Sequence, residues 1–197
     1  MKILHTADWH LGKKLDRFSR IEEQRAVMEE IVQIADAQKV DVVIIAGDLF
    51  DNFTPNTDAI ELFYKTVKQL SLGGRRPVVA ISGNHDAPKL IDAPDPLARE
   101  CGIFLIGQPF ALVTPIETQD FKITHSSAGF IELQLASFPY PLRIIHTAYA
   151  NEPRLREELE GDKQLAINQF LSDKWQALAQ EYCDSKGVNI PIPQRAL

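Results

Sequence analysis

The sequence predicts an α/β fold built around a parallel β-sheet. In its first half, apolar runs of strand length alternate with amphipathic helical segments, which is the β-α-β-α-β order typical of parallel sheets. Residues 40–46 (Val-Asp-Val-Val-Ile-Ile-Ala) are almost continuously apolar, as expected for a strand that is covered on both faces. The length of 197 residues is sufficient for one domain with a substantial core.

Three strands and two helices are predicted in the first half. The strands cover residues 2–7, 40–46 and 77–82, and the helices cover residues 20–38 and 56–70. Ser19 is the expected N-cap of the first helix, with Glu22 completing a capping box. The pair Gly73-Gly74 is expected to end the second helix.

The second half changes character after residue 86. Prolines at positions 88, 94 and 96 interrupt it, and a short helix is predicted near residues 96–101. Short strands are predicted at residues 103–106, 110–113, 121–124, 130–136 and 142–148. Residues 151–183 are predicted to be mostly helical, with apolar anchors at Leu165, Phe170, Trp175 and Leu178. The segment 188–197 contains two prolines and has no predicted packing partner.

Composition limits the possible functions. The net charge of −6 argues against a surface coated with basic residues for nucleic acid. It does not exclude a nuclease, because carboxylates that bind metal ions are counted as negative. No apolar run approaches the roughly 20 residues of a membrane span, and the N-terminus does not resemble a signal peptide. The two scattered cysteines, Cys101 and Cys183, suit reduced thiols, so we expect a cytoplasmic protein.

Side chains that can bind metal ions follow each of the three predicted strands. They stand in Asp8-Trp9-His10, in Gly47-Asp48-Leu49-Phe50-Asp51 and in Gly83-Asn84-His85-Asp86. Because ligands of open α/β sheets lie beyond the carboxyl ends of the strands, we expect these turns to meet. Any one of them alone is more typical of an ordinary turn or helix cap, but three in succession favour a metal site.

The donor types indicate how such a site would work. Asp8 and His10 are two residues apart, so an extended turn can direct both at one ion. Asp48 has two carboxylate oxygens and could bridge two metals, and Gly47 allows the backbone to approach closely. Asn84 offers a neutral amide oxygen. The mixture favours manganese, iron or zinc, and the lack of nearby cysteine argues against a structural zinc site.

These turns resemble the motifs of a known family. Asp-x-His, Gly-Asp-x-x-Asp and Gly-Asn-His-Asp resemble the first three motifs of the calcineurin-like metallophosphoesterases. The longer stretches at residues 5–12, 46–51 and 81–86 are similar to the SbcD type of bacterial DNA-repair nuclease, a branch of that family. The resemblance implies a calcineurin-like fold, with a β-sandwich flanked by helices, of which residues 1–197 would be the N-terminal portion.

The resemblance also implies roles for individual residues. Asp8 and His10 would bind the first of two divalent metal ions, for which Mn²⁺ is the expected identity. Asp48 would bridge the two ions, and Asn84 would bind the second. His85 would be catalytic without binding metal: it would lie over the scissile phosphate and donate a proton to the leaving oxygen while an activated water attacks.

Other motif residues are expected in supporting positions or outside the chain. Asp51 and Asp86 are expected beside the ligands rather than as ligands. The family also supplies three later histidines, two of them in Gly-His-x-His, whereas this chain has only His125 and His146 after residue 85. His125 is expected in a loop, and His146 is expected to be structural within a strand. We therefore expect the later motifs and any DNA-binding cap domain to lie outside these residues, and the chain alone to have weak or no activity.

The resemblance implies DNA and an SbcC-type coiled-coil ATPase as partners. Lys13, Lys14 and Arg17 follow the first turn and could contact DNA phosphates, although a solvated loop would explain them equally well. A homodimer is also possible. Leu90, Ile91 and Leu97, together with the helix at residues 56–70, could form its face, although core packing would explain these residues equally well.

The preferred function is a metal-dependent DNA nuclease, an exonuclease or endonuclease, in double-strand break repair and recombination. Trp9 and the Leu49-Phe50-Asp51 sequence favour this interpretation. One alternative is a phosphoesterase for small phosphodiesters or nucleotides. Another is a catalytically incomplete module for metal binding or assembly, which the missing histidines favour.

Overall fold

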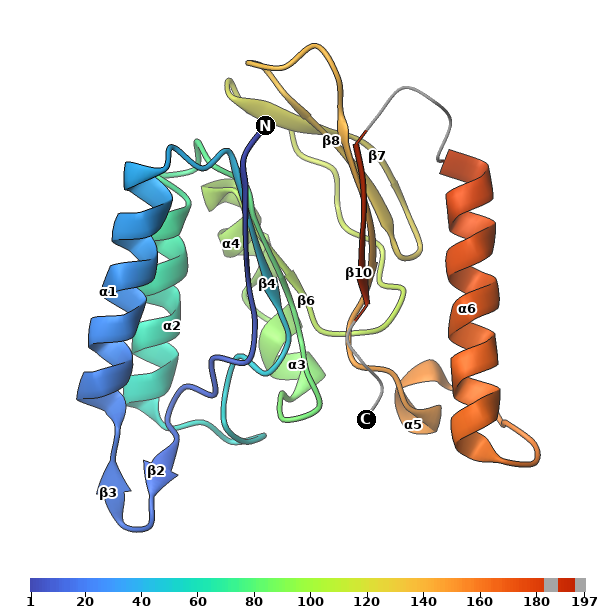
Figure 1. Ribbon diagram of the computed structural model, residues 1–197, viewed down its shortest axis with the longest axis horizontal. Coiled ribbons are helices and arrows are strands. Elements are labelled where there is room, and N and C mark those ends of the chain that lie inside the picture. The colour runs from blue at the N-terminus through green and yellow to red at the C-terminus, as the bar shows by residue number, and fades with distance from the viewer. Residues whose placement is uncertain (183–187, 194–197) are drawn as a thin grey trace. The chain divides into compact units, whose positions relative to one another are not determined.

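The chain divides into two units, Met1–Gly107 and Gln108–Leu197, in a computed structural model that describes residues 1–182 and 188–193 (Figure 1). The first unit contains a parallel sheet with helices packed against it, so the predicted α/β class is confirmed. Cys183 and the last four residues of the tail lie outside the described residues. In the described part of the chain, no helix is long and apolar enough to cross a membrane.

Four parallel strands form the sheet of the first unit. Its order is β1-β4-β5-β6, with β1 at Ile3–Thr6, β4 at Val42–Ala46, β5 at Val78–Ile81 and β6 at Ile103–Ile106. Every residue of β4 is buried, and because successive side chains point to opposite faces, both faces of this strand are covered. β6 was expected among the later short strands, but it completes the parallel sheet instead.

Two long helices lie side by side against this sheet (Figure 1). They are α1 at Ile21–Ala37 and α2 at Thr57–Leu70. Asn56 caps α2, because its side-chain oxygen accepts a hydrogen bond from the Ala59 N–H at 2.8 Å. The buried residues of α2 recur every three or four positions and join the core of the first unit.

The start of α1 differs from the prediction. Arg20 occupies the N-cap position and its side chain makes no capping hydrogen bond, so the expected capping box of Ser19 and Glu22 is wrong. Ser19 instead belongs to a small antiparallel hairpin, formed by β2 at Lys14–Leu15 and β3 at Phe18–Ser19, which the sequence did not predict. Pairing within this hairpin takes Ser19 out of the capping position, and its hydroxyl accepts from the Ile21 N–H at 3.3 Å.

The segment between β5 and β6 is helical. It contains α3 at Pro88–Asp92, α4 at Asp95–Ala98 and a 3-10 turn at Arg99–Cys101, where only one short helix was expected. Ile91 of α3 is buried in the core, so packing accounts for it without a dimer. Leu97 is 79% exposed.

The second unit contains a mixed sheet of order β10-β9-β8-β7. Its strands are β7 at Phe121–Ser127, β8 at Phe130–Leu135, β9 at Leu142–Thr147 and β10 at Val188–Pro193. The pairs β7–β8 and β8–β9 are antiparallel, whereas β9 and β10 are parallel. The expectation that the tail has no partner is therefore wrong for β10, and its two prolines are tolerated because it lies at an edge.

Helices α5 at Glu152–Leu155 and α6 at Lys163–Tyr182 complete the second unit. Phe170 and Trp175 of α6 pack on a small core, and the Trp175 indole N–H donates to the Thr147 hydroxyl at 2.9 Å. Leu165 is 67% exposed, so its expected anchoring role is wrong. The strand expected at residues 110–113 is also absent, since Phe110 has a left-handed φ of 53° and the flanking prolines cannot donate to a ladder.

His146 lies on β9 without access to solvent. Neither of its ring nitrogens has a hydrogen-bond partner in the described part of the chain. Burial lowers the pKa of His146 from its ordinary 6.5 to about 4, because the charged imidazolium would lose its hydration. The folded protein therefore holds this ring neutral, as an apolar residue of the core.

The pKa of His146 predicts how stability depends on pH. Because the folded-state pKa is depressed, the full stability is present above pH 6.5 and is lost as the pH falls towards 4. The loss amounts to roughly 3 kcal/mol of unfolding free energy. Urea denaturation at a series of pH values should show this component in the unaltered chain and not in His146→Leu. His125→Leu removes an exposed histidine and is the control, which should keep this component. An unchanged pH dependence in His146→Leu would contradict the explanation.

Candidate metal centre

Backbone hydrogen bonds join the first two turns beyond the ends of β1 and β4. They run from His10 N–H to Asp48 O at 2.9 Å, from Leu11 N–H to Leu49 O at 3.0 Å and from Asp51 N–H to Leu11 O at 3.1 Å. The ladder between the two strands thus continues into the turns. It holds the side chains that follow each strand at fixed positions relative to one another.

The Asp86 carboxylate joins the second turn to the third. It accepts hydrogen bonds from the backbone N–H groups of Leu49 at 3.0 Å, Phe50 at 2.9 Å and Gly83 at 2.6 Å. Asp86 is 0% exposed. Burial raises the pKa of Asp86, and the three N–H donors oppose this rise by favouring the carboxylate. The side chain replaces a backbone ladder where the strands have ended.

The turns adopt backbone conformations that cost free energy. Asp8, His10 and Asp48 have positive φ values of 56°, 43° and 44°, in the left-handed region that non-glycine residues rarely occupy. A Cβ atom at Gly83 would overlap the carboxylate and the backbone nitrogen of Asp48, so only glycine fits there. Strained residues of this kind persist where surrounding contacts over-determine them, and they cluster at functional sites.

Asp8, His10 and Asp48 come together at this edge of the sheet. One potential ligand atom of each lies within 4.8 Å of those of the other two. Asp48 Oδ2 lies 3.7 Å from His10 Nε2, whereas Asp48 Oδ1 accepts from the His85 backbone N–H at 3.0 Å. The two oxygens of Asp48 therefore face different turns, an arrangement compatible with a bridging ligand.

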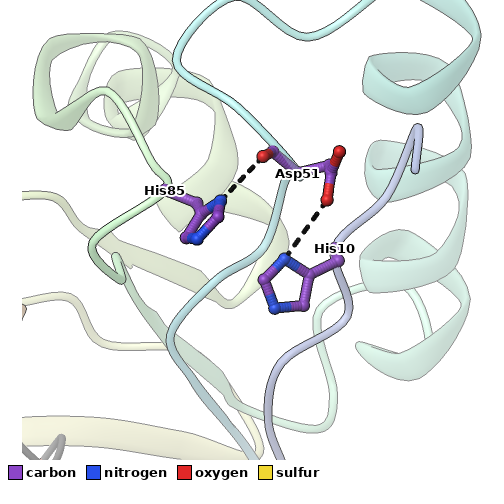
Figure 2. A group of neighbouring side chains, drawn as sticks. All are labelled: His10, Asp51 and His85. Atoms are coloured by element: carbon purple, nitrogen blue, oxygen red, sulfur yellow. Dashed lines mark hydrogen bonds and ion pairs between the residues drawn. The ribbon is translucent and has the colours of Figure 1, made fainter. Parts of the chain in front are cut away.

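A second group consists of His10, Asp51 and His85 (Figure 2). His10 Nδ1 lies 3.5 Å from Asp51 Oδ1, and the imidazole rings of His10 and His85 are 4.9 Å apart. His85 Nδ1 donates to the Asp51 backbone oxygen at 2.8 Å. Because a carbonyl oxygen carries no proton, this contact requires the proton on Nδ1 and leaves Nε2 as the atom that exchanges one.

The two groups are contiguous and fit a divalent cation. His10 belongs to both, with Nε2 directed at Asp48 and Nδ1 at Asp51. Carboxylate oxygens and imidazole nitrogens are the donors that Mn²⁺, Fe²⁺ and Zn²⁺ accept. Asn84 is exposed in the third turn, one residue before His85. The donor set is thus suited to metal binding by the chemistry of its atoms and by their proximity.

Two residues contribute more than the sequence indicated. Asp51 was expected beside the ligands, but its carboxylate lies within the second group. The sequence feature that could have indicated this position is that Asp51 is the second aspartate of Gly-Asp-x-x-Asp. Gln24 of α1 fixes the first turn, since its Oε1 accepts from the Gly12 N–H at 2.9 Å and its Nε2 donates to the His10 backbone oxygen at 2.7 Å. Nothing in the local sequence distinguishes Gln24 from any other polar helix residue.

The remaining candidates lie apart from this edge. His125 belongs to β7 rather than to the expected loop, with its ring 5.0 Å from that of Tyr182. Among the described residues, neither His125 nor His146 belongs to a group that could hold a metal ion. Trp9 is buried in the core, where its indole N–H donates to the Thr6 hydroxyl at 3.0 Å. It therefore anchors the first turn rather than facing a ligand.

Comparisons with known proteins agree on one family. A family model described as calcineurin-like phosphoesterase matches residues 1–180. A Bacillus subtilis protein named as a subunit of the nuclease SbcCD is 42% identical over 159 residues, covering 81% of this chain and 36% of that protein. Proteins of the same name from Rhodobacter capsulatus and Staphylococcus saprophyticus are 39% and 41% identical, covering 54% and 47% of this chain. The aligned parts are 27% and 24% of those two proteins, so the chain spans about a third or less of the curated relatives it matches.

Asp86→Asn should separate the second and third turns. An amide has only one acceptor oxygen and would direct its NH₂ group at backbone donors, so buried N–H groups would lose their partner. We expect the free energy of unfolding to fall by about 1–3 kcal/mol. We also expect Mn²⁺ affinity, measured by isothermal titration calorimetry, to fall about 10- to 100-fold.

Asp92→Asn provides a matched control. Asp92 Oδ1 likewise accepts from a backbone N–H, that of Gly107, at 2.6 Å, but Asp92 belongs to neither group of candidate ligands. This variant should lose stability and retain its affinity for Mn²⁺. Equal losses of affinity in the two variants would show that Asp86 acts only through general stability.

Proposed function

The chain belongs to the calcineurin-like phosphoesterase family, and from this premise we propose that it carries the metal centre of a DNA nuclease. The observation that supports the proposal most directly is the convergence of Asp8, His10 and Asp48 at one edge of a parallel sheet, next to His85. The nuclease activity itself is inferred from the relatives, which are named as nuclease subunits.

We propose that four residues hold two divalent cations, most suitably Mn²⁺. These residues are Asp8, His10, Asp48 and Asn84. Cations at such a site neutralise charge on a phosphate and make water more acidic. Asp48 would serve both ions, because its two oxygens face different turns. Asp51 would hold His10 in place through its carboxylate and His85 through its backbone oxygen.

His85 is the proposed catalytic residue. Its Nδ1 is occupied by the Asp51 backbone oxygen, which fixes the orientation of the ring and leaves Nε2 available. Nε2 can hold a proton and pass it to the sugar oxygen that leaves when a phosphodiester bond breaks. The protonated ring would also offset negative charge on the phosphoryl oxygens.

The partners follow from the relatives and remain part of the proposal. DNA is the proposed substrate, and an SbcC-type coiled-coil ATPase is the proposed partner in repair and recombination. We further propose that residues 1–197 correspond to the N-terminal portion of a nuclease domain in the cytoplasm. The family's later histidine ligands would then correspond to the part of the relatives that this chain does not match.

Asp48→Ala should abolish Mn²⁺ binding and hydrolysis together, because Asp48 contacts both the first and the third turn. The measurements are calorimetric Mn²⁺ titration and cleavage of labelled duplex DNA with Mn²⁺. We expect weak cleavage by the unaltered chain and none by the variant. Hydrolysis of bis(p-nitrophenyl) phosphate without DNA cleavage would indicate an esterase for small substrates. Mn²⁺ binding without any turnover by a full-length chain would indicate an assembly module, and undetectable Mn²⁺ binding by the unaltered chain would contradict the proposed centre.

His85→Ala should separate binding from catalysis. With Nε2 removed but the carboxylates retained, we expect unchanged Mn²⁺ affinity and hydrolysis about 10²- to 10⁴-fold slower. His125→Ala is the control, since it removes an exposed imidazole from the second unit. Loss of Mn²⁺ binding in His85→Ala would make His85 a ligand and refute the catalytic assignment.

A further inference from the structure

The β2–β3 hairpin projects from the first unit between the first metal turn and α1 (Figure 1). Every residue from 13 to 20 is exposed. Four of these eight residues are cationic, and Asp16 is their single carboxylate. In a chain with a net charge of −6, this is a local reversal of sign beside the metal centre.

Within the part of the chain that the structure describes, two of the four cations lack a charged partner. Lys13 Nζ lies 3.9 Å from Asp51, and Arg20 Nε lies 2.7 Å from Glu23. Lys14 and Arg17 form no ion pair with any described residue. Their charges are therefore available to an anionic ligand without breaking an ion pair in the protein.

The hairpin also exposes two large apolar side chains. Leu15 is 67% exposed and Phe18 is 64% exposed, and the two residues are partners across the ladder. The Arg17 guanidinium lies over the Phe18 ring, 5.5 Å from its centre. An exposed aromatic ring with cations beside it is the combination with which proteins hold unpaired bases and their phosphates.

A cleft lies between the base of the hairpin and the metal centre. Its volume is about 360 Å³, and its lining includes Asp8 and His10 from the first turn, Lys13 and Arg20 from the base of the hairpin, and Glu23 from α1. The cleft thus extends from the two residues that flank the hairpin to two of the candidate ligands. Glu23 lies in this cleft, but its charge is balanced by Arg20.

We infer that the β2–β3 hairpin binds an unpaired DNA strand and directs it into the metal centre. Phe18 and Leu15 contact the bases, and Lys14 and Arg17 contact the phosphates. The inference rests on the proposed nuclease function, for which it specifies the form of the substrate. The excess of positive charge favours a nucleic acid over a protein partner of the same apolar character.

The exposed Phe18 ring is the reason for inferring an unpaired strand rather than a duplex. Bases within a duplex stack on one another, so their faces are not open to a side chain, whereas lysine and arginine contact phosphates of either form. Removing Phe18 should therefore affect single strands selectively. Removing the two cations should weaken binding to both forms and lower its dependence on salt.

The test is fluorescence anisotropy with the full chain, without metal and at low salt. The probes are labelled oligothymidine and a labelled duplex. Phe18→Ala should bind oligothymidine about tenfold more weakly and the duplex unchanged, and Phe18→Trp should restore binding. Lys14→Gln with Arg17→Gln should weaken both complexes and reduce the salt slope by about 0.7 for each phosphate of the single strand that the protein no longer binds.

Matched controls remove the same groups elsewhere. Lys68→Gln removes an exposed cation from α2, and Leu97→Ala removes an exposed apolar side chain from α4; both should bind as the unaltered chain does. The inference would be overturned if the unaltered chain did not bind oligothymidine, or if the hairpin variants bound it as tightly as the unaltered chain does. The second result would assign the hairpin to another partner, such as a protein. Mn²⁺ titration of the same samples tests the metal centre separately, because the hairpin variants should bind Mn²⁺ with the affinity of the unaltered chain.

Discussion

The buried carboxylate of Asp86 is the interaction on which the candidate site depends. β4 and β5 end before their turns, so the backbone ladder cannot hold those turns together. The Asp86 carboxylate links the turns instead, because it accepts hydrogen bonds from the backbone N–H groups of Leu49, Phe50 and Gly83. A buried carboxylate is costly unless it is fully hydrogen-bonded, and this one is satisfied by the turns that it positions. Together with the hydrogen bond from the His85 N–H to Asp48 Oδ1 and that from His85 Nδ1 to the Asp51 backbone oxygen, this side chain fixes the register between the two turns.

Around this link, the protein gathers groups that disfavour one another. Asp8 and Asp48 belong to one group of potential ligands with His10, and Asp51 adds a third carboxylate nearby. Like charges in such proximity repel, and three of these residues have left-handed backbones. The repulsion and strain are offset by the core beneath the turns, where Trp9 packs against Phe63, and by the hydrogen bonds from Gln24. A site held in this way is organised before a cation arrives, so binding a cation relieves repulsion that folding has already imposed.

Acidic and basic side chains are segregated within the first unit. The turns present carboxylates and imidazoles, which suit cations, whereas the hairpin that follows the first turn presents Lys14 and Arg17 beside Phe18. The cleft beside Asp8 and His10 is lined by Lys13 and Arg20, the residues that flank this hairpin. An acidic chain can thus approach a polyanion through a short basic element while keeping its acidic side chains for metal. The overall charge of −6 therefore says less about the substrate than the local order of charges along residues 8–20.

The sequence by itself determined the α/β class, the strands that precede the three turns and the residue types that follow them. These features are local, because apolar runs and helical periodicity record burial along a short stretch of chain. Only the tertiary structure decided that Ile103–Ile106 completes the parallel sheet, that the segment at residues 110–113 is not a strand, and that Gln24 supports the first turn. It also decided which backbone N–H groups donate hydrogen bonds to Asp86. Two of these donors, Leu49 and Phe50, lie 37 and 36 residues away in the sequence. The physical reason is that such hydrogen bonds form between segments brought together by packing, and no local pattern of residues records which segments will meet.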